Sequence, residues 1–448
     1  MKKSFRVIRI GIPVLAAGVF CLWLIRKADP LSPGAVSAFL SLCLFTLTLT
    51  EALCRLLDDR WSFDARIQKG DTPWERFIVW RRLLLFGMAV SIFQYVLVYL
   101  LVHPGTDFIH SFRLLYYRSD VAHYMGIAKN WYVPEGDERL RLVFLPLYPL
   151  TIRALSWNGT YFDGALAAAQ LFSLACLPAG YELFRLDGDK EAAMGCARLL
   201  FLLPGNAFLR VPMSEGLFLF LTLLDVLYAR ERRFLLSALF TALAAFTRSL
   251  GILLLGLLFL EMASAFAEAY RDDGKRALRL LPGYAGCLLL CCTGTLAYLV
   301  INWRVTGDPL TFLTYQRENW NQQLGLFFNT ASYQTEYMLM YLKSGDLNSV
   351  ISLSLPNLIC CFGTLLLLFA GRKRLRTSYL IWALAYYVAA IGATWLLSGP
   401  RYLAMLFPLA IALRRLCKGT YGRIAIEGTL LISQTCYLLL LAMDLYVY

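Results

Sequence analysis

Runs of about 20 apolar residues recur along the whole chain, and they limit its possible folds more than any other feature. An α-helix needs about 20 residues to cross the hydrocarbon core of a bilayer. Of the 448 residues, 59% are hydrophobic and 16% are charged, whereas a soluble domain carries about 25% charged residues. A soluble fold would lack the polar groups to cover its surface. We therefore expect an all-α polytopic membrane protein with one membrane domain.

The apolar runs predict thirteen transmembrane helices. Two of them, 234–247 and 402–413, are short for a span. No small-residue cleavage site clearly follows the first run, so we interpret it as an uncleaved span. The expected spans are 7–25, 34–54, 83–102, 161–184, 191–211, 214–229, 234–247, 250–269, 280–301, 348–370, 377–397, 402–413 and 424–446.

The net charge of +13 comes from Lys and Arg in short loops between the apolar runs. Cytoplasmic loops of membrane proteins carry an excess of these residues, so the charge does not indicate nucleic-acid binding. We predict a multi-pass protein of the cell membrane, or of the endoplasmic reticulum if eukaryotic, with a cytoplasmic N-terminus and an extracytoplasmic C-terminus. Most of the 43 Lys and Arg then lie in the cytoplasmic segments 1–9, 55–82, 185–190, 230–233, 271–279, 371–376 and 414–423.

Two loops on the opposite side are long, at 103–160 and 302–347. Both are rich in aromatic, amide and charged residues, and long loops that are not low-complexity are usually functional. Segment 120–132 is expected to form a short helix at the membrane surface, where its Tyr and Trp side chains suit the headgroup level. We find no convincing internal repeat, which argues against inverted-repeat transporters.

Short polar motifs at the ends of spans all fall on this outer side, and together they suggest one site at the membrane surface. Each motif taken alone also fits an ordinary polar loop. The motifs are 118–124, 144–149, 212–215, 247–249, 307–310 followed by Gln316, and 398–402.

Asp120 is the first candidate for a general base, because a carboxylate at the membrane surface can take a proton from a bound hydroxyl. Asp107, Glu135 and Asp137 are rivals in the same loop. His123 follows Asp120 by three residues and shares its face if the segment is helical. His123 can orient the carboxylate or bind substrate, and an ordinary interfacial histidine fits equally well.

Two arginines, Arg248 and Arg401, lie at outer ends of spans in apolar surroundings. They can extend toward lipid headgroups or bind a phosphate through two parallel hydrogen bonds. Ser214 and Glu215 open a span, where a capping serine and an acid in the first turn are also ordinary helix-start residues.

The 12 cysteines lie in apolar spans or in loops assigned to the cytoplasm, and none has the CxxC spacing of a metal site. We interpret them as free thiols packed as small hydrophobic groups. His, Cys and carboxylate residues also lack zinc-site spacing. We therefore expect neither a tightly bound metal nor another cofactor.

The ordered motifs resemble the PIG-V family, the second mannosyltransferase of glycosylphosphatidylinositol (GPI) assembly, and more closely its bacterial homologues in the GT-C superfamily of membrane glycosyltransferases. The family has an Arg-Trp-Asp motif before an aromatic-rich helix, and further motifs follow in a fixed order. The matching positions are 118–120, 144–149, Pro204, Phe208, Ser214, Glu215, Leu217, Phe218, Ala244, 247–249, 307–310, 400–403 and 407–409.

Two departures from the family pattern stand out. Ser119 replaces the tryptophan before the aspartate, which can alter the acceptor pocket. Two additional spans, 7–25 and 34–54, precede the span that normally leads into this motif. We therefore divide the chain into an N-terminal addition at 1–82, which includes a basic cytoplasmic loop, and a GT-C-like domain at 83–448.

The resemblance implies an inverting, metal-independent sugar transfer on the extracytoplasmic face. The donor would be a polyprenyl-phosphate-linked sugar, mannose by family default, and the acceptor a hydroxyl of a glycolipid, polymer or protein. Asp120 would act as catalytic base, and Arg248 and Arg401 would hold the donor phosphate. The resemblance adds six substrate-binding candidates, which are His123, Tyr148, Ser214, Glu215, Gln316 and Tyr402.

The rival interpretation is a polytopic transporter or lipid flippase. Such a protein is expected to place acidic residues and broken helices near the middle of the bilayer. The polar motifs here fall at the outer ends of spans, which favours an enzyme. Convergence of Asp120, Glu215, Arg248 and Arg401 on one site would distinguish the two interpretations.

Overall fold

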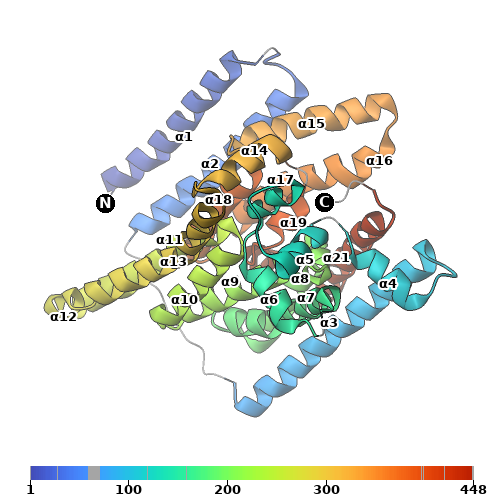
Figure 1. Ribbon diagram of the computed structural model, residues 1–448. Helices are drawn as coiled ribbons and strands as arrows, with labels where there is room; N and C mark the ends of the chain where they lie inside the picture. The colour runs from blue at the N-terminus through green and yellow to red at the C-terminus, as the bar shows by residue number, and fades with distance from the viewer. Residues whose placement is uncertain are drawn as a thin grey trace.

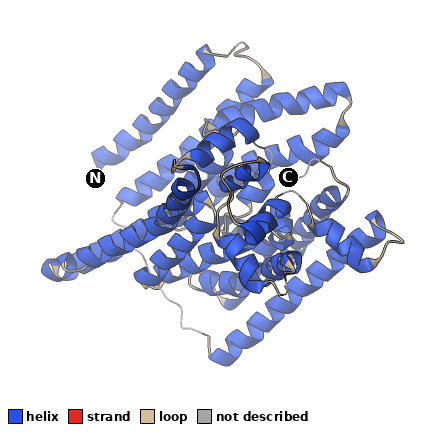
Figure 2. Ribbon diagram, viewed as in Figure 1, coloured by secondary structure: helices blue, strands red, loops and turns tan. Residues whose placement is uncertain are grey.

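The computed structural model describes residues 2–27, 29–58, 71–118, 120–157, 159–394, 396, 398–417 and 419–445. These residues form helices joined by turns, with an isolated antiparallel bridge between Leu324 and Ala393 (Figure 2). The predicted all-α fold class is confirmed. Ser119, the residue that departs from the family motif, lies outside the described residues.

The chain runs through helices labelled α1 to α21 in Figure 1, with short 3-10 or π segments between some of them. Their bounds are α1 Lys2–Ile25, α2 Pro33–Leu57, α3 Pro73–Val102, α4 Phe108–Tyr116, α5 Val121–Asn130, η2 Asp137–Val143, α6 Leu147–Leu155, α7 Tyr161–Arg185, α8 Lys190–Leu202, η3 Pro204–Arg210, α9 Glu215–Arg230, α10 Phe234–Thr247, η4 Ser249–Leu253, α11 Leu254–Asp272, α12 Gly274–Leu278, α13 Leu281–Thr306, α14 Thr311–Trp320, α15 Phe327–Ser344, α16 Leu347–Ser349, η5 Val350–Ser354, α17 Leu355–Gly371, α18 Thr377–Ile391, α19 Gly399–Leu403, α20 Pro408–Leu416 and α21 Gly419–Ala442.

Among the described residues, eight helices are long and apolar enough to cross a membrane. A ninth span results if α8 and η3, which meet at a bend of 79°, are counted together. The other expected spans coincide with shorter helices, α9, α10, α18 and α20. A nine-residue helix such as α20 rises only about 14 Å, so it cannot cross a bilayer alone. The chain is a multi-pass membrane protein.

Helix α3 begins at Pro73, ten residues before the predicted start of this span at residue 83. Thr72 caps the helix, because its Oγ1 accepts a hydrogen bond from the Glu75 N–H at 3.2 Å and Glu75 Oε2 accepts one from the Thr72 N–H at 2.9 Å. This reciprocal pair is a capping box. The expected division of the chain between residues 82 and 83 therefore falls inside a helix.

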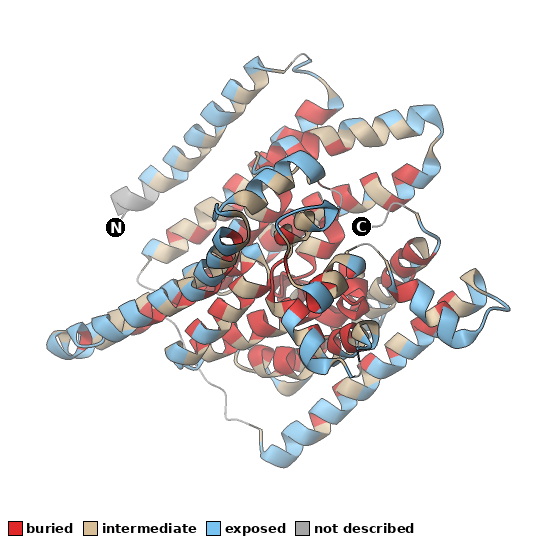
Figure 3. Cartoon of the chain, in the orientation of Figure 1, coloured by how far each residue is buried: buried red, intermediate tan, exposed pale blue. Residues whose placement is uncertain are grey.

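Buried residues gather at the centre of the bundle, and the outer helices α1, α3 and α13 are largely exposed (Figure 3). The centre contains large aromatic side chains such as Trp382, Tyr386 and Phe407. Apolar side chains such as Leu22 and Leu289 are exposed on the outer helices. Exposed apolar side chains of this kind suit contact with lipid chains. The helices also satisfy their own backbone hydrogen bonds, as they must where no water is present.

Polar contacts join the short basic loops to one another. Arg55 donates hydrogen bonds to the carbonyls of Arg372 and Leu375, and Arg230 pairs with Asp187 at 2.9 Å. All of these residues lie in or beside segments that the sequence assigned to the cytoplasmic side. The contacts therefore bring these segments together at one end of the bundle.

The two long loops meet in a second assembly. Tyr298, near the end of α13, donates a hydrogen bond to the Leu142 carbonyl in η2 at 2.6 Å, and the Arg139 guanidinium lies 5.9 Å from the ring centre of Tyr315 in α14. The chain end joins the same assembly, because Arg118 pairs with Asp444 at 2.7 Å. Residues from both predicted outer loops thus form one polar region.

Candidate active site

Asp120 lies at the N-cap position of α5, the helix predicted at 120–132. An aspartate at this position usually accepts a hydrogen bond from the first helical turn, but the Asp120 side chain makes no such bond. Its Oδ2 instead accepts a hydrogen bond from Arg401 Nη2 at 2.8 Å. The side chain is 25% exposed, so the carboxylate is both oriented and accessible.

Arg401 connects Asp120 to a second acid. It lies in the short helix α19, and its side chain is almost fully buried. While Nη2 contacts Asp120, Nε donates to Glu215 Oε1 at the start of α9. One guanidinium group thus fixes two carboxylates that are 95 positions apart in the sequence.

Glu215 is fully buried and also receives a hydrogen bond from Arg248 Nη1. The same Arg248 nitrogen donates to Ser214 Oγ at 3.0 Å, and the hydroxyls of Ser214 and Tyr124 hydrogen-bond at 2.9 Å. Burying an unpaired charge is strongly unfavourable. The positive charges of two arginines cancel the negative charges of two carboxylates here. The network can therefore be buried without a net charge.

The structure therefore brings together Asp120, Glu215, Arg248 and Arg401, the four residues chosen to distinguish an enzyme from a transporter. They come from α5, α9, the α10–η4 junction and α19. Sequence reasoning did not assign Tyr124 a role in this network. Its only sequence signal was an aromatic residue one position after His123.

Two of the predicted tyrosines border the network. Tyr148 is fully buried, its hydroxyl donates to the Ala165 carbonyl at 3.0 Å, and its ring packs edge-on against Tyr124. The Arg248 guanidinium lies 5.5 Å from the ring centre of Tyr402. Both tyrosines thus help to enclose the charged groups.

His123 lies beside Asp120 in an aromatic cluster. Its ring stacks on Phe144, with centres 4.8 Å apart, and meets Trp320 edge-on at 6.4 Å. Burial lowers the pKa of His123 below its usual 6.5, although the nearby Asp120 charge opposes this change. The imidazole is therefore neutral at neutral pH, which suits a wall of a binding site.

Gln316 lies four residues before Trp320 on α14, at a half-buried position. Its backbone carbonyl accepts a hydrogen bond from Gln322 at 3.1 Å. The helix contributes Trp320 to the ring contact with His123. Sequence analysis expected a long loop at 302–347 and named Gln316 in it, but predicted neither α14 nor the contact of Trp320, because a single tryptophan in a polar loop carries no distinctive signal.

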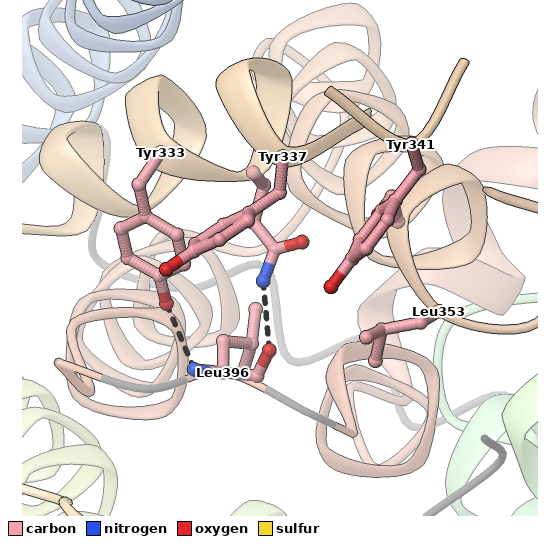
Figure 4. A pocket seen from close by; sticks show the side chains of 7 residues that line it. Tyr333, Tyr337, Tyr341, Leu353 and Leu396 are labelled. Atoms are coloured by element: carbon pink, nitrogen blue, oxygen red, sulfur yellow. Dashed lines mark hydrogen bonds between the residues drawn. The ribbon is translucent and has the colours of Figure 1, made fainter. Parts of the chain in front are cut away.

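A small pocket lies between α15, η5 and Leu396 (Figure 4). Tyr333 accepts a hydrogen bond from the Leu396 N–H at 2.8 Å, and Gln334 donates to the Leu396 carbonyl at 2.7 Å. Asp120 is not one of the residues that line this pocket. The pocket borders the segment that leads, five residues later, to Arg401. Its lining residues are Tyr333, Gln334, Tyr337, Tyr341, Leu353, Ser354 and Leu396.

Fold and site together define a helical multi-pass membrane protein with a buried network of paired arginines and acids near its two long loops. No family model matches the chain. The chain is similar to GPI alpha-1,6-mannosyltransferase 2 of Rattus norvegicus and of Mus musculus, with 30% identity over 164 residues in each case. These matches confirm the resemblance to the PIG-V family.

Each match covers 34% of this chain and 32% of the relative, so it spans about a third of the curated protein. Among solved structures, the chain is similar to the apo crystal structure of ArnT from Cupriavidus metallidurans, with a TM-score of 0.44 and 18% identity. That alignment covers 77% of this chain and 61% of ArnT.

Proposed function

We propose that this protein is a membrane glycosyltransferase of the GT-C type. It transfers a sugar, mannose by analogy with its relatives, from a polyprenyl-phosphate-linked donor to a hydroxyl of a glycolipid, polymer or protein on the extracytoplasmic face. One observation carries the proposal. Asp120, at the motif position of the base, is held by Arg401 in a site built from four separated motifs.

The reaction needs few groups, because the lipid phosphate is already a good leaving group. The acceptor oxygen attacks the anomeric carbon and forms the new glycosidic bond, while the bond from that carbon to the phosphate oxygen breaks. The hydroxyl proton goes to the Asp120 carboxylate, a general base. Attack opposite the leaving group inverts the anomeric configuration, and polyprenyl phosphate is released.

Arg248 and Arg401 were expected to hold the donor phosphate. Their contacts support a different role, since each guanidinium already faces Glu215 and Arg401 also holds Asp120. We assign them the task of orienting the base. Arg401 holds one oxygen of the Asp120 carboxylate through a hydrogen bond of 2.8 Å.

A transporter or lipid flippase is the second candidate, and the 79° bend between α8 and η3 favours it. Broken helices mark binding sites in many transporters. At this bend, however, the buried Gln434 Nε2 donates to the carbonyls of Phe201 and Leu203, at 2.8 and 3.0 Å. The break is thus occupied by the protein's own side chains.

The test is a transfer assay on the purified full chain in lipid nanodiscs, with decaprenyl-phosphate mannose as donor and the cell's extracted glycolipids as acceptors. We expect a new glycoside of inverted configuration, released decaprenyl phosphate and unchanged rates with a chelator. Lipid movement between leaflets without a glycoside product would support the flippase instead. Loss of transfer with chelator, restored by a divalent ion, would exclude the metal-free mechanism.

A further inference from the structure

The Asp120 network has no net charge. Another group must therefore supply the positive charge that binds the donor phosphate. The charges of Arg248 and Arg401 are matched by those of Asp120 and Glu215. The leaving phosphate gains negative charge as its bond to the sugar breaks, so a cation placed there stabilises the transition state. Another cation near α5 is needed for this purpose.

Arg141 fits that requirement. It lies in the last turn of η2, and its side chain is 18% exposed. Its guanidinium rests directly on Gly126 in the middle of α5, because a Cβ added at Gly126 would come within 2.4 Å of Arg141 Cζ. Glycine inside a helix is unfavourable. Its presence is explained here by the space that the guanidinium needs.

The partner of Arg141 is replaceable. Nη1 lies 2.8 Å from Glu138 Oε1, in a pair three residues apart whose acid is 46% exposed. Exposed pairs of this kind are weak. The same nitrogen is buried and makes no hydrogen bond of regular geometry in the described structure. The guanidinium, which is 18% exposed as a whole, can therefore exchange its weak partner Glu138 for a phosphate.

The position of Arg141 also suits the reaction. Asp120, His123 and Gly126 follow one another at three-residue intervals, so His123 neighbours each of the other two on the surface of α5. Six residues of helix rise about 9 Å. Asp120 and Arg141 both lie near enough to His123 to affect its pKa, Asp120 raising it and Arg141 lowering it, while burial lowers it most.

We propose that Arg141, seated on Gly126, binds the phosphate of the lipid-linked donor and stabilises the charge on that phosphate as the sugar leaves. This inference rests on the proposed function and adds a residue to it. The order along α5 is then base, sugar and phosphate. Arg118 is the rival cation, since it precedes Asp120 by two residues and pairs with the exposed Asp444.

The test measures binding and needs no catalysis. Decaprenyl phosphate and the neutral alcohol decaprenol are titrated into the full chain in nanodiscs, and tryptophan fluorescence reports binding. Arg141→Gln should weaken decaprenyl phosphate binding about 10- to 100-fold, as expected for loss of hydrogen bonds to a charged group. Decaprenol binding should not change.

Gly126→Ala provides an independent variant, because its methyl group displaces the guanidinium while every charge remains. It should weaken phosphate binding in the same direction. Arg139→Gln, on the same 3-10 helix, is the matched control and should bind like the wild type.

The inference is overturned if Arg141→Gln and Gly126→Ala both bind decaprenyl phosphate normally, if Arg118→Gln alone loses binding, or if the wild type does not bind it. Binding through Arg141 without any sugar transfer would instead reject the proposed function and leave the phosphate site standing.

Discussion

At the scale of single residues, Glu215 holds the site together. It is fully buried and contacts both Arg248 and Arg401. Glu215→Gln keeps the shape but removes the charge that compensates the two arginines. Breaking a buried ion pair in this way costs about 3–5 kcal/mol.

We therefore expect a clearly lower melting temperature for Glu215→Gln, measured by thermal denaturation in detergent. Glu318→Gln is the matched control, because Glu318 forms an exposed pair with Arg317 and such pairs contribute little. Equal melting temperatures for the two variants would show that Glu215 is not a structural centre of the site.

At the scale of elements, α15 connects the first two helices, α1 and α2, to the site. One side of α15 contacts the α1–α2 hairpin, with Lys27 paired to Glu336 at 2.8 Å and Thr335 hydrogen-bonded to Ser37 at 2.8 Å. Its other side carries Tyr333 and Gln334, which hold Leu396 ahead of Arg401 (Figure 4). The two additional helices thus support the segment that positions Arg401.

Gly34 allows this contact, because a Cβ there would lie 2.4 Å from Glu336 Oε1. Gly34→Ala should displace the Glu336 carboxylate from its contacts with Lys27 and Ser32 and destabilise the protein by up to about 1 kcal/mol, the usual contribution of such an exposed pair. Gly18→Ala on α1 is the control, since a Cβ at Gly18 meets no atom within 4 Å. Thermal denaturation of both variants measures the effect, and an unchanged Gly34→Ala protein would contradict the close docking of α2 on α15.

At the scale of the whole molecule, the sequence predicted the helical membrane fold, the short helix after Asp120 and the residues that converge on it. These features follow from local patterns of apolar and polar residues. The apolar pattern alone placed the start of α3 at residue 83, ten residues too late. The capping box of Thr72 and Glu75 was the sequence signal for the true start at Pro73.

Other features could not be predicted from local patterns. The partners of Arg401 come from residues 120 and 215, and only the folded chain shows that both acids face one guanidinium. The bend after α8 and the seat of Arg141 on Gly126 likewise depend on contacts between distant segments.

The predicted membrane orientation has its own test. In a background without reactive native cysteines, Glu318→Cys in α14 should react with an impermeant thiol reagent added outside cells. Lys275→Cys in α12 should react only after the membrane is opened, because basic loops remain in the cytoplasm. The reverse pattern would contradict the orientation and place Asp120 on the cytoplasmic side.

The central claim is that Asp120 is the base, and one substitution tests it most directly. Asp120→Asn is nearly isosteric, and its amide oxygen can still accept the hydrogen bond from Arg401. An amide is not a useful base, so transfer from decaprenyl-phosphate mannose should fall by about 10²–10⁴ while the melting temperature stays near that of the wild type. Asp137→Asn, in the same loop but outside the network, should remain fully active. Full activity in Asp120→Asn would contradict the account.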